Sequence, residues 1–387
     1  MNVLIVPSWY PEGNDELLGI YHKEFASAIS DYVNTNMLYI YRIGLSYVFK
    51  YPFMKKLEID DLGTYKVYKF KMLDIGKIFP KLQMRLYARK LEKSFKKYLK
   101  DNKFPDVIHA EVTLPAGYAC AKLGKKYNIP VLVTEHSSNY YQYFKGDNKE
   151  FGDYVLSNTL FSTVSRYMKD ELSLSCCEVI PNIVDVGVFN KKRYKRGATL
   201  RLVVVAGFRN GKNLDDIIKC MDVLVHKRNM NVHLDMVGDG YLMEYLKEMV
   251  GNLKLNDYVT FTGRKSKEEV SSILANNDIY LIASDTETFC IPGVEALASG
   301  LVLVSSRCKG PLEYIDSKCG EFFDAHDIEG MCDAIERVSK KLDKYDVNYL
   351  RSVSLKYSRE NVANIAINVY KKMLDKNKSL WQFGASQ

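Results

Sequence analysis

Short apolar runs rich in β-branched residues recur along the whole chain, and stretches with helical spacing lie between them. In the first half these runs predict strands at residues 3–6, 37–41, 107–110, 131–134, 162–165 and 178–181. A second series predicts strands at residues 202–207, 232–238, 258–263, 279–284 and 301–306. Strands that alternate with helices are typical of parallel sheets covered on both faces. We therefore predict an α/β fold with two Rossmann-like domains that face one another.

The segment 185–199 separates the two series, because it is polar, charged and without a period. Helical spacing resumes at residues 361–374, and we expect this helix to cross back to the first domain. The predicted parts are an N-terminal domain at 1–185, a linker at 186–200, a C-terminal domain at 201–360, and a C-terminal helix and tail at 361–387.

Length and composition narrow the class of protein. A chain of 387 residues has room for two domains, and 47% hydrophobic with 26% charged residues excludes a disordered or fibrous protein. No apolar run approaches the roughly 18–20 residues that span a bilayer. The short apolar run at the start follows no basic residue and is interrupted by Pro7, so we expect a cytoplasmic protein without a secretory signal. The 8 cysteines include no CxxC pair, which argues against a disulfide framework and a zinc site.

Positive charge is concentrated in the first half of the chain. Residues 51–100 contain 14 Lys or Arg and 5 Asp or Glu, while the whole chain has a net charge of +8. Within this stretch, residues 77–100 combine an apolar stripe at helical spacing with a lysine-rich opposite face. The helix is either an ordinary surface helix or a peripheral contact with an anionic membrane, where each basic residue adds about 1 kcal/mol. We expect no nucleic-acid partner, because no nucleic-acid-binding motif accompanies the charge.

Two loops of the second half are candidates for ligand binding, because ligands of parallel α/β sheets lie beyond the carboxyl ends of the strands. The first, FRNGKNLDDII, enters a helix at about Asn213. Its main-chain amides, together with Lys212 and Arg209, can hold a phosphate group. A glycine-containing turn with a lysine is a weak signal when taken alone.

The second loop, DTETFCIPGVEALASG, contains two glutamates eight residues apart, Glu287 and Glu295. Pro292 fits the first turn of a helix that runs to Ser299, which leaves the amides of residues 289–291 free for a pyrophosphate. A carboxylate suits the paired hydroxyls of a ribose or a hexose. The alternative is structural: Glu295 is a solvated helix residue and Glu287 caps the helix.

The glutamate pair within SDTETFCIPGVEALASG resembles the paired-glutamate motif of family 4 glycosyltransferases, which have the GT-B fold and retain the anomeric configuration. Other segments resemble that family in the same order along the chain. They are PSWYP followed by LGIYHKEFASAI, DVIHAEVTLPAGYACAKLGKKYNIPVLVTEHSS, VIPNIVD and CKGPLEYI. The resemblance covers nearly the whole chain.

On the donor side, the resemblance implies that Glu295 holds the nucleotide ribose and that Glu287 contacts the transferred sugar. Lys212 neutralises the leaving diphosphate. The other donor-binding positions that it implies are Gly207, Arg209, Phe289, Cys290 and Ile291. The family usually has an arginine at the position of Gly207, and Arg209 lies two residues later.

On the acceptor side, the resemblance makes His136 the histidine beside the reaction centre. The catalytic residues that it implies are thus Glu287, His136 and Lys212. Gly19 matches the small residue that lets the substrates approach, and His109 and Glu111 lie in the acceptor segment. His109 is equally well explained as an interior histidine, and Glu111 stands where the family often has a second histidine.

The function that the resemblance implies is retaining, metal-independent transfer of a hexose or N-acetylhexosamine without a cofactor. The donor is a nucleoside diphosphate sugar, UDP-linked rather than GDP-linked. The acceptor is a glycan or a lipid-linked molecule, in surface polysaccharide or glycoconjugate synthesis. The alternatives are a hydrolysing nucleotide-sugar epimerase and a non-catalytic GT-B protein that scaffolds another transferase. A dehydrogenase is disfavoured, because no GxGxxG follows the first strand of either half.

Overall fold

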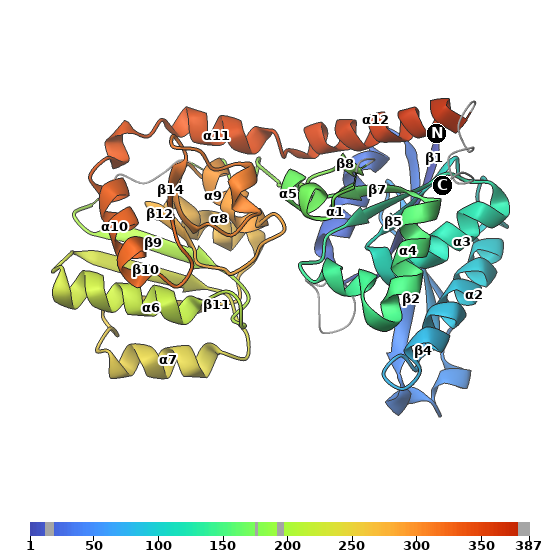
Figure 1. Ribbon diagram of the computed structural model, residues 1–387, viewed down its shortest axis with the longest axis horizontal. Helices are drawn as coiled ribbons and strands as arrows, with labels where there is room; N and C mark the ends of the chain where they lie inside the picture. The colour runs from blue at the N-terminus through green and yellow to red at the C-terminus, as the bar shows by residue number, and fades with distance from the viewer. Residues whose placement is uncertain (12–18, 175–176, 192–196, 378–387) are drawn as a thin grey trace. The chain divides into compact units, whose positions relative to one another are not determined.

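The computed structural model describes residues 1–11, 19–174, 177–191 and 197–377 (Figure 1). The chain folds into two compact units. The first contains Met1–Asn182 and the residues from Val362 onward, and the second contains Ile183–Asn361. Each unit has a largely parallel sheet with helices packed on it, which confirms the predicted α/β class with two Rossmann-like units.

The sheet of the first unit has eight strands in the order β3-β4-β2-β1-β5-β6-β7-β8, and only β3 and β4 pair in antiparallel fashion. The strands are β1 (Asn2–Pro7), β2 (Asn34–Gly44), β3 (Leu57–Asp61), β4 (Lys66–Asp74), β5 (Val107–Glu111), β6 (Val131–Glu135), β7 (Leu160–Thr163) and β8 (Cys177–Val179). Pro7 of β1 pairs with Glu111 of β5, which places Glu111 at the carboxyl end of the central strands.

Helices cover both faces of this sheet. They are α1 (Ile20–Ser30), α2 (Pro80–Tyr98), α3 (Tyr118–Tyr127), α4 (Lys149–Asn158), α5 (Arg166–Glu171) and α12 (Arg359–Asn377). Figure 1 shows α2, α3 and α4 together on one side of the sheet. Tyr87, Leu91 and Phe95 of α2 are fully buried in the core on that side, as the apolar stripe of the predicted amphipathic helix requires.

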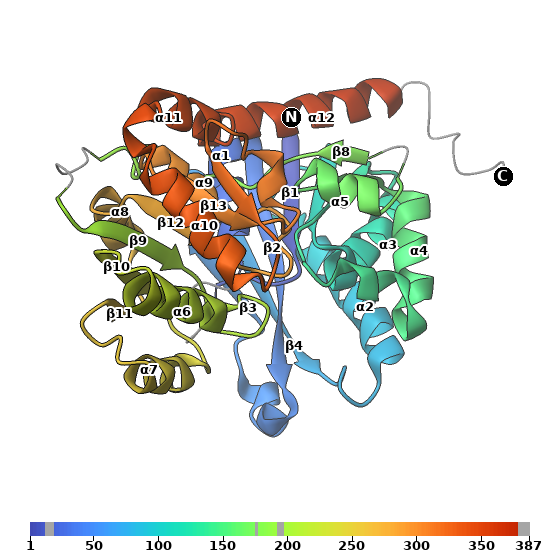
Figure 2. The same cartoon turned by 60° about the vertical axis from the view of Figure 1, so that its left-hand side comes forward.

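The second unit has an entirely parallel sheet in the order β11-β10-β9-β12-β13-β14. Its strands are β9 (Leu200–Val205), β10 (Val232–Val237), β11 (Val259–Gly263), β12 (Ile279–Ile282), β13 (Val302–Ser306) and β14 (Gly320–Phe323). Its helices are α6 (Leu214–Asp222), α7 (Met243–Asn252), α8 (Lys267–Ala275), α9 (Ile291–Ala298), α10 (Ile328–Ser339) and α11 (Val347–Leu355). In Figure 2, α6 and α10 lie together on one face of the sheet.

The strand order of the second unit reverses between β9 and β12. The chain progresses outward from β9 through β10 to β11, and then returns to the other side of β9 to form β12. Ligands of open parallel sheets bind at such a reversal, beyond the carboxyl ends of the two strands. The two loops that the sequence singles out leave these same strands.

Every strand predicted from an apolar run is present, whereas β3, β4 and β14 were not predicted. The C-terminal helix also meets its prediction, because α12 packs on the first unit: the Tyr370 hydroxyl lies 2.7 Å from Nδ1 of His109. Part of the expected linker, residues 192–196, and the tail from residue 378 lie outside the described residues.

Across residues 1–11, 19–174, 177–191 and 197–377, the helices are all too short or too polar to cross a membrane.

Candidate active site

The loops that follow β9 and β12 are tied to each other by side-chain and main-chain hydrogen bonds. Asn213, the residue before α6, has a left-handed backbone with a φ of 50°. Its side-chain amide donates to Asp285 Oδ1 at 2.6 Å and to the carbonyl of Ala283 at 3.0 Å. The amide of Asp285 donates in turn to the carbonyl of Gly211 at 3.0 Å. These bonds fix the two loops side by side at the reversal of the strand order.

Lys212 and Glu287 form an ion pair between these loops. The side chains are 19% and 13% exposed, and the Ser284 hydroxyl donates to the same carboxylate at 2.7 Å. Burial alone lowers the pKa of Lys212, but the carboxylate of Glu287 outweighs it and raises that pKa above its ordinary value. Lys212 is therefore a fixed cation at the carboxyl edge of the sheet.

The helix that carries the second glutamate starts close to its predicted position. α9 begins at Ile291, and Cys290 before it adopts a left-handed φ of 67°. The Phe289 ring is fully buried against Tyr314 and Tyr357, with ring centroids 5.8 and 5.0 Å apart. Phe289 therefore offers a ligand only its main chain. Glu295 lies in the second turn of α9 and is half-buried.

Gly207 and Arg209 are both exposed. A Cβ atom built on Gly207 would have no neighbour within 4 Å among the described atoms. The fold therefore leaves room for a larger side chain at the position where the family usually has an arginine.

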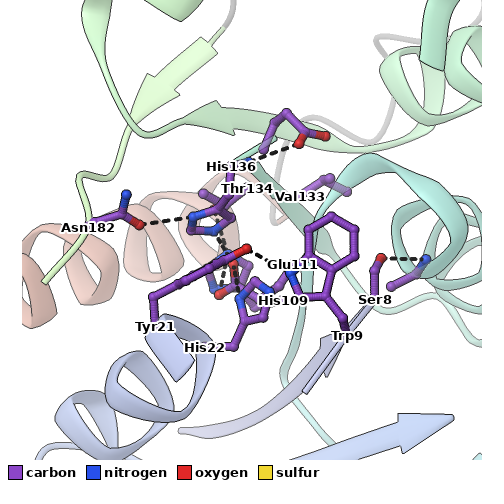
Figure 3. Close-up of polar contacts among 12 residues, drawn as sticks. Ser8, Trp9, Tyr21, His22, His109, Glu111, Val133, Thr134, His136 and Asn182 are labelled. Carbon is purple, nitrogen blue, oxygen red and sulfur yellow. Dashed lines mark hydrogen bonds and ion pairs between the residues drawn. The ribbon is translucent and has the colours of Figure 1, made fainter. Parts of the chain in front are cut away.

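In the first unit, Glu111 and His136 form a close pair at the carboxyl ends of β5 and β6 (Figure 3). Nε2 of His136 lies 2.6 Å from Glu111 Oε2, and Nδ1 lies 3.0 Å from Asn182 Oδ1. His22 of α1 lies beside them, with its Nδ1 3.5 Å from the same carboxylate oxygen. The carboxylate and the two imidazoles thus share one small volume.

Glu111 stays ionised although its side chain is only 2% exposed. Burial raises its pKa, but the charges of His109 and His136, the hydrogen bond from His136 and the close contact with His22 outweigh burial and hold that pKa well below the ordinary value. The first unit therefore carries a buried negative charge next to His136, which is more exposed than His22 and His109.

His109 lies in the interior of the first unit, with both ring nitrogens in use. Nε2 lies 2.6 Å from the Thr134 hydroxyl and Nδ1 lies 2.7 Å from the Tyr370 hydroxyl. Burial lowers the pKa of His109. In this arrangement His109 packs behind Glu111 and presents no free nitrogen to an acceptor.

Gly19 is required by the local geometry at the start of α1. Its φ of 72° is left-handed, and a Cβ there would lie 2.8 Å from both Cδ1 and the carbonyl oxygen of Trp9. The Trp9 indole donates to the Tyr21 hydroxyl at 2.7 Å, so this contact also orients the first turn of α1. Residues 12–18, which precede Gly19, lie outside the described residues.

Three polar residues of this region were not predicted from the sequence: His22, Glu135 and Asn182. The Glu135 carboxylate accepts hydrogen bonds from the amides of Thr113, His136 and Ser137, which fixes the loop that carries His136. All three lie inside the segments that resemble the family, His22 in LGIYHKEFASAI, Glu135 in VLVTEHSS and Asn182 in VIPNIVD, and this was the available signal.

Two family models match the chain, and together they span residues 60–347. The model described as Glycosyltransferase Family 4 matches residues 60–188, and the model described as Glycosyl transferases group 1 matches residues 189–347.

Similar curated proteins match about half of the chain. A phosphatidylinositol N-acetylglucosaminyltransferase subunit of Homo sapiens is 25% identical over 222 residues, which cover 56% of this chain and 46% of that protein. N-acetyl-alpha-D-glucosaminyl L-malate synthase of Bacillus anthracis is 24% identical over 251 residues, which cover 59% of this chain and 64% of that protein. The chain thus spans about half to two thirds of the length of these relatives.

Similarity to solved structures extends over almost the whole chain. The sucrose-phosphate synthase of Thermosynechococcus elongatus superposes with a TM-score of 0.76 at 15% identity, covering 97% of this chain and 100% of that one. At this identity the likeness establishes the fold, which is GT-B.

Proposed function

We infer the function from one premise: the chain belongs to the family 4 glycosyltransferases and has the GT-B fold. We propose that it transfers a hexose or N-acetylhexosamine from a nucleoside diphosphate sugar, with retention of the anomeric configuration. Donor binding belongs to the second unit and acceptor binding to the first.

The observation that carries this proposal is the Lys212–Glu287 pair at the reversal of the strand order. It places a buried cation and a carboxylate where a parallel sheet binds its ligand. A nucleoside diphosphate sugar presents a diphosphate for the cation and hydroxyls for the carboxylate.

The diphosphate gains negative charge as it leaves the sugar, and groups that meet this charge in the transition state lower the barrier. We assign this role to the ammonium of Lys212 and to the main-chain amides at the start of α9. When the diphosphate takes the ammonium, the Glu287 carboxylate is released to accept hydrogen bonds from the sugar hydroxyls. Glu295 accepts those of the ribose.

On the acceptor side we assign the contact to His136, held by Glu111 and Asn182. Retention follows from attack on the same face that the diphosphate leaves, with the departing phosphate taking the proton of the acceptor hydroxyl. Because Lys212 and the helix amides already neutralise the diphosphate, this scheme requires no metal ion on the donor.

The names of the relatives suggest the donor sugar and the acceptor class. Both curated relatives described above are N-acetylglucosaminyltransferases or synthases by name, and one is named for a phosphatidylinositol lipid. We therefore propose a UDP-linked donor with N-acetylglucosamine as the first sugar to test. The proposed acceptor is lipid-linked or a glycan, in surface polysaccharide or glycoconjugate synthesis at the cytoplasmic side of a membrane.

A peripheral membrane contact fits the surface of the first unit. α2 exposes a row of cations, and large apolar side chains are exposed in segments 45–53 and 78–82. Phe49 is 88% and Phe53 is 90% exposed. Both segments lie at the lower end of the first unit in Figures 1 and 2. Exposed aromatic residues beside a basic helix are typical of a surface that meets anionic lipid headgroups.

The test is to incubate the pure chain with a panel of nucleotide sugars and lipid or glycan acceptors, with and without EDTA. We expect nucleoside diphosphate release that depends on the acceptor and survives EDTA, and a product whose anomeric configuration by NMR matches that of the donor. An inverted product would contradict the retaining mechanism. An epimerised free sugar would favour a hydrolysing epimerase, and no turnover with any donor would favour a scaffold protein.

A further inference from the structure

His22, Glu111 and His136 bring three potential metal ligands together in the first unit (Figure 3). One atom of each residue lies within 4.8 Å of the corresponding atoms of the other two. The three residues come from α1, the end of β5 and the loop after β6, so the chain assembles them from segments far apart in the sequence. Cysteine pairs are the usual sequence signal of a metal site, and this group contains no cysteine, so the sequence predicted no metal.

His22 is the most informative member of the group. It is fully buried, and neither ring nitrogen has a hydrogen-bond partner among the described residues. A buried polar group without a partner costs about 1–3 kcal/mol, so such groups call for an explanation. A metal ion beside Nδ1 would give this buried ring the partner that it lacks among the described residues.

We propose that His22, Glu111 and His136 bind a divalent transition-metal ion such as Zn²⁺, with one coordination position left open. Two imidazoles and one carboxylate form a ligand set typical of zinc and related ions. Tetrahedral zinc with bonds of about 2.0–2.1 Å places its ligand atoms about 3.4 Å apart. The distance of 3.5 Å between His22 Nδ1 and Glu111 Oε2 meets this spacing.

The third ligand must exchange a proton for the metal. Nε2 of His136 and Oε2 of Glu111 are 2.6 Å apart, which requires a proton between them. Binding removes this proton to solvent, the two atoms separate by about 0.8 Å to the spacing of zinc ligands, and both lone pairs turn to the ion.

The surroundings hold the ligands in the way that metal sites usually require. The other nitrogen of His136 lies 3.0 Å from Asn182 Oδ1, which orients the ring. The other oxygen of Glu111 lies 3.7 Å from Nε2 of His109, and that ring is fixed by Thr134 and Tyr370. His136 is 10% exposed at its side chain and is the edge through which an ion can enter.

The metal takes the nitrogen of His136 and the carboxylate of Glu111, so it should inhibit sugar transfer. This consequence rests on the proposed function, because it assumes that His136 and Glu111 meet the acceptor. Binding of the ion itself does not depend on that assumption.

The binding test uses the full chain freed of metal by EDTA and dialysis, titrated with Zn²⁺ by calorimetry and with Co²⁺ by visible absorption. We expect one Zn²⁺ per chain, release of a proton, and the intense absorption of four-coordinate Co²⁺. His22→Asn and Glu111→Gln should each weaken Zn²⁺ binding by more than about 100-fold, because even outer partners of metal ligands contribute 10- to 100-fold. His226→Asn, at an exposed histidine of the second unit, should leave the affinity unchanged.

Glu111→Gln is nearly isosteric, so it keeps the test valid if His22→Asn fails to fold. Circular dichroism in EDTA checks that both variants are folded. Wild-type chain that binds no Zn²⁺, or folded variants that bind it as tightly as wild type, would overturn the site. In the activity arm, Zn²⁺ should inhibit wild-type transfer and EDTA should restore it, while His22→Asn, measured against its own rate in EDTA, should resist Zn²⁺. Equal inhibition of both proteins would overturn the link to catalysis, whereas a chain inactive in every assay would refute the proposed function and leave the binding test intact.

Discussion

Replacing Lys212 by alanine removes the cation assigned to the leaving diphosphate, and its effect can be estimated from the structure. The Lys212 side chain is only 19% exposed, and its ion pair with Glu287 holds it between the loops that follow β9 and β12. Two unit charges about 4 Å apart in such surroundings interact by about 4 kcal/mol when the effective dielectric constant is about 20. Loss of one preorganised partner of the developing charge costs about 2–4 kcal/mol in other enzymes. We therefore expect kcat/KM to fall about 30- to 900-fold, since each 1.36 kcal/mol is a factor of ten.

The assay is acceptor-dependent release of nucleoside diphosphate, with kcat and KM measured separately. Lys212→Met should show the same loss, because it keeps the length of the side chain but not its charge. Lys219→Ala is the matched control: Lys219 lies on the adjoining helix α6, its side chain is 45% exposed, and it pairs with Asp215 and with the buried Asp216. A kcat/KM within about threefold of wild type for Lys212→Ala, or an equal loss for Lys219→Ala, would refute the assignment.

Three further predictions concern other parts of the chain. Glu295→Ala should chiefly raise KM for the donor and Glu287→Ala should chiefly lower kcat, because an interaction made only in the transition state appears in kcat; wild-type kinetics in both would contradict the donor site. The carboxylates of Asp216 and Asp285 raise the pKa of His326. Protonated His326 should therefore stabilise the fold fully below about pH 6.5, and this contribution should be lost as the pH rises through the higher pKa of the folded state. An NMR titration that gives His326 a pKa at or below its ordinary value would contradict this. Binding to phosphatidylglycerol vesicles should weaken with rising salt and with loss of the basic charge of α2, while donor affinity stays unchanged; binding that ignores salt, or none at all, would leave an ordinary surface helix. The four substitutions for that test are Lys93→Gln, Lys96→Gln, Lys97→Gln and Lys100→Gln.

The fold class could be predicted because buried parallel strands have continuous apolar sequences, which can be recognised without knowing which strands they pair with. β3 and β4 were not predicted because they form a partly exposed antiparallel pair at the sheet edge, where charged residues alternate with apolar ones. β14 was not predicted because Gly320–Phe323 begins with a glycine and a glutamate and contains no β-branched apolar run.

Part of the candidate site could likewise be predicted from the sequence, and part of it depends on how distant segments pack. The Lys212 and Glu287 loops follow predicted strands, so the rule for parallel sheets was enough to select them. The contact of His22 with Glu111 joins residues 89 positions apart in the sequence. Such a contact depends on how α1 packs on the sheet, which no local spacing records. No spacing in the sequence therefore singles out His22, and it is the packing of α1 that brings it to the carboxylate.

The bond between Tyr370 and His109 has a consequence for synthesis of the protein in the cell. Domains usually fold from the N-terminus as the chain leaves the ribosome, at about 5–20 residues per second. Here the first sheet is translated by Val179, but the residue that fixes the ring behind Glu111 is made only near the end, on α12. In a nascent chain, Nδ1 of His109 therefore lacks its Tyr370 partner until the whole second unit has been made. The His109 ring behind Glu111 is thus held at both nitrogens only after the second unit has been translated.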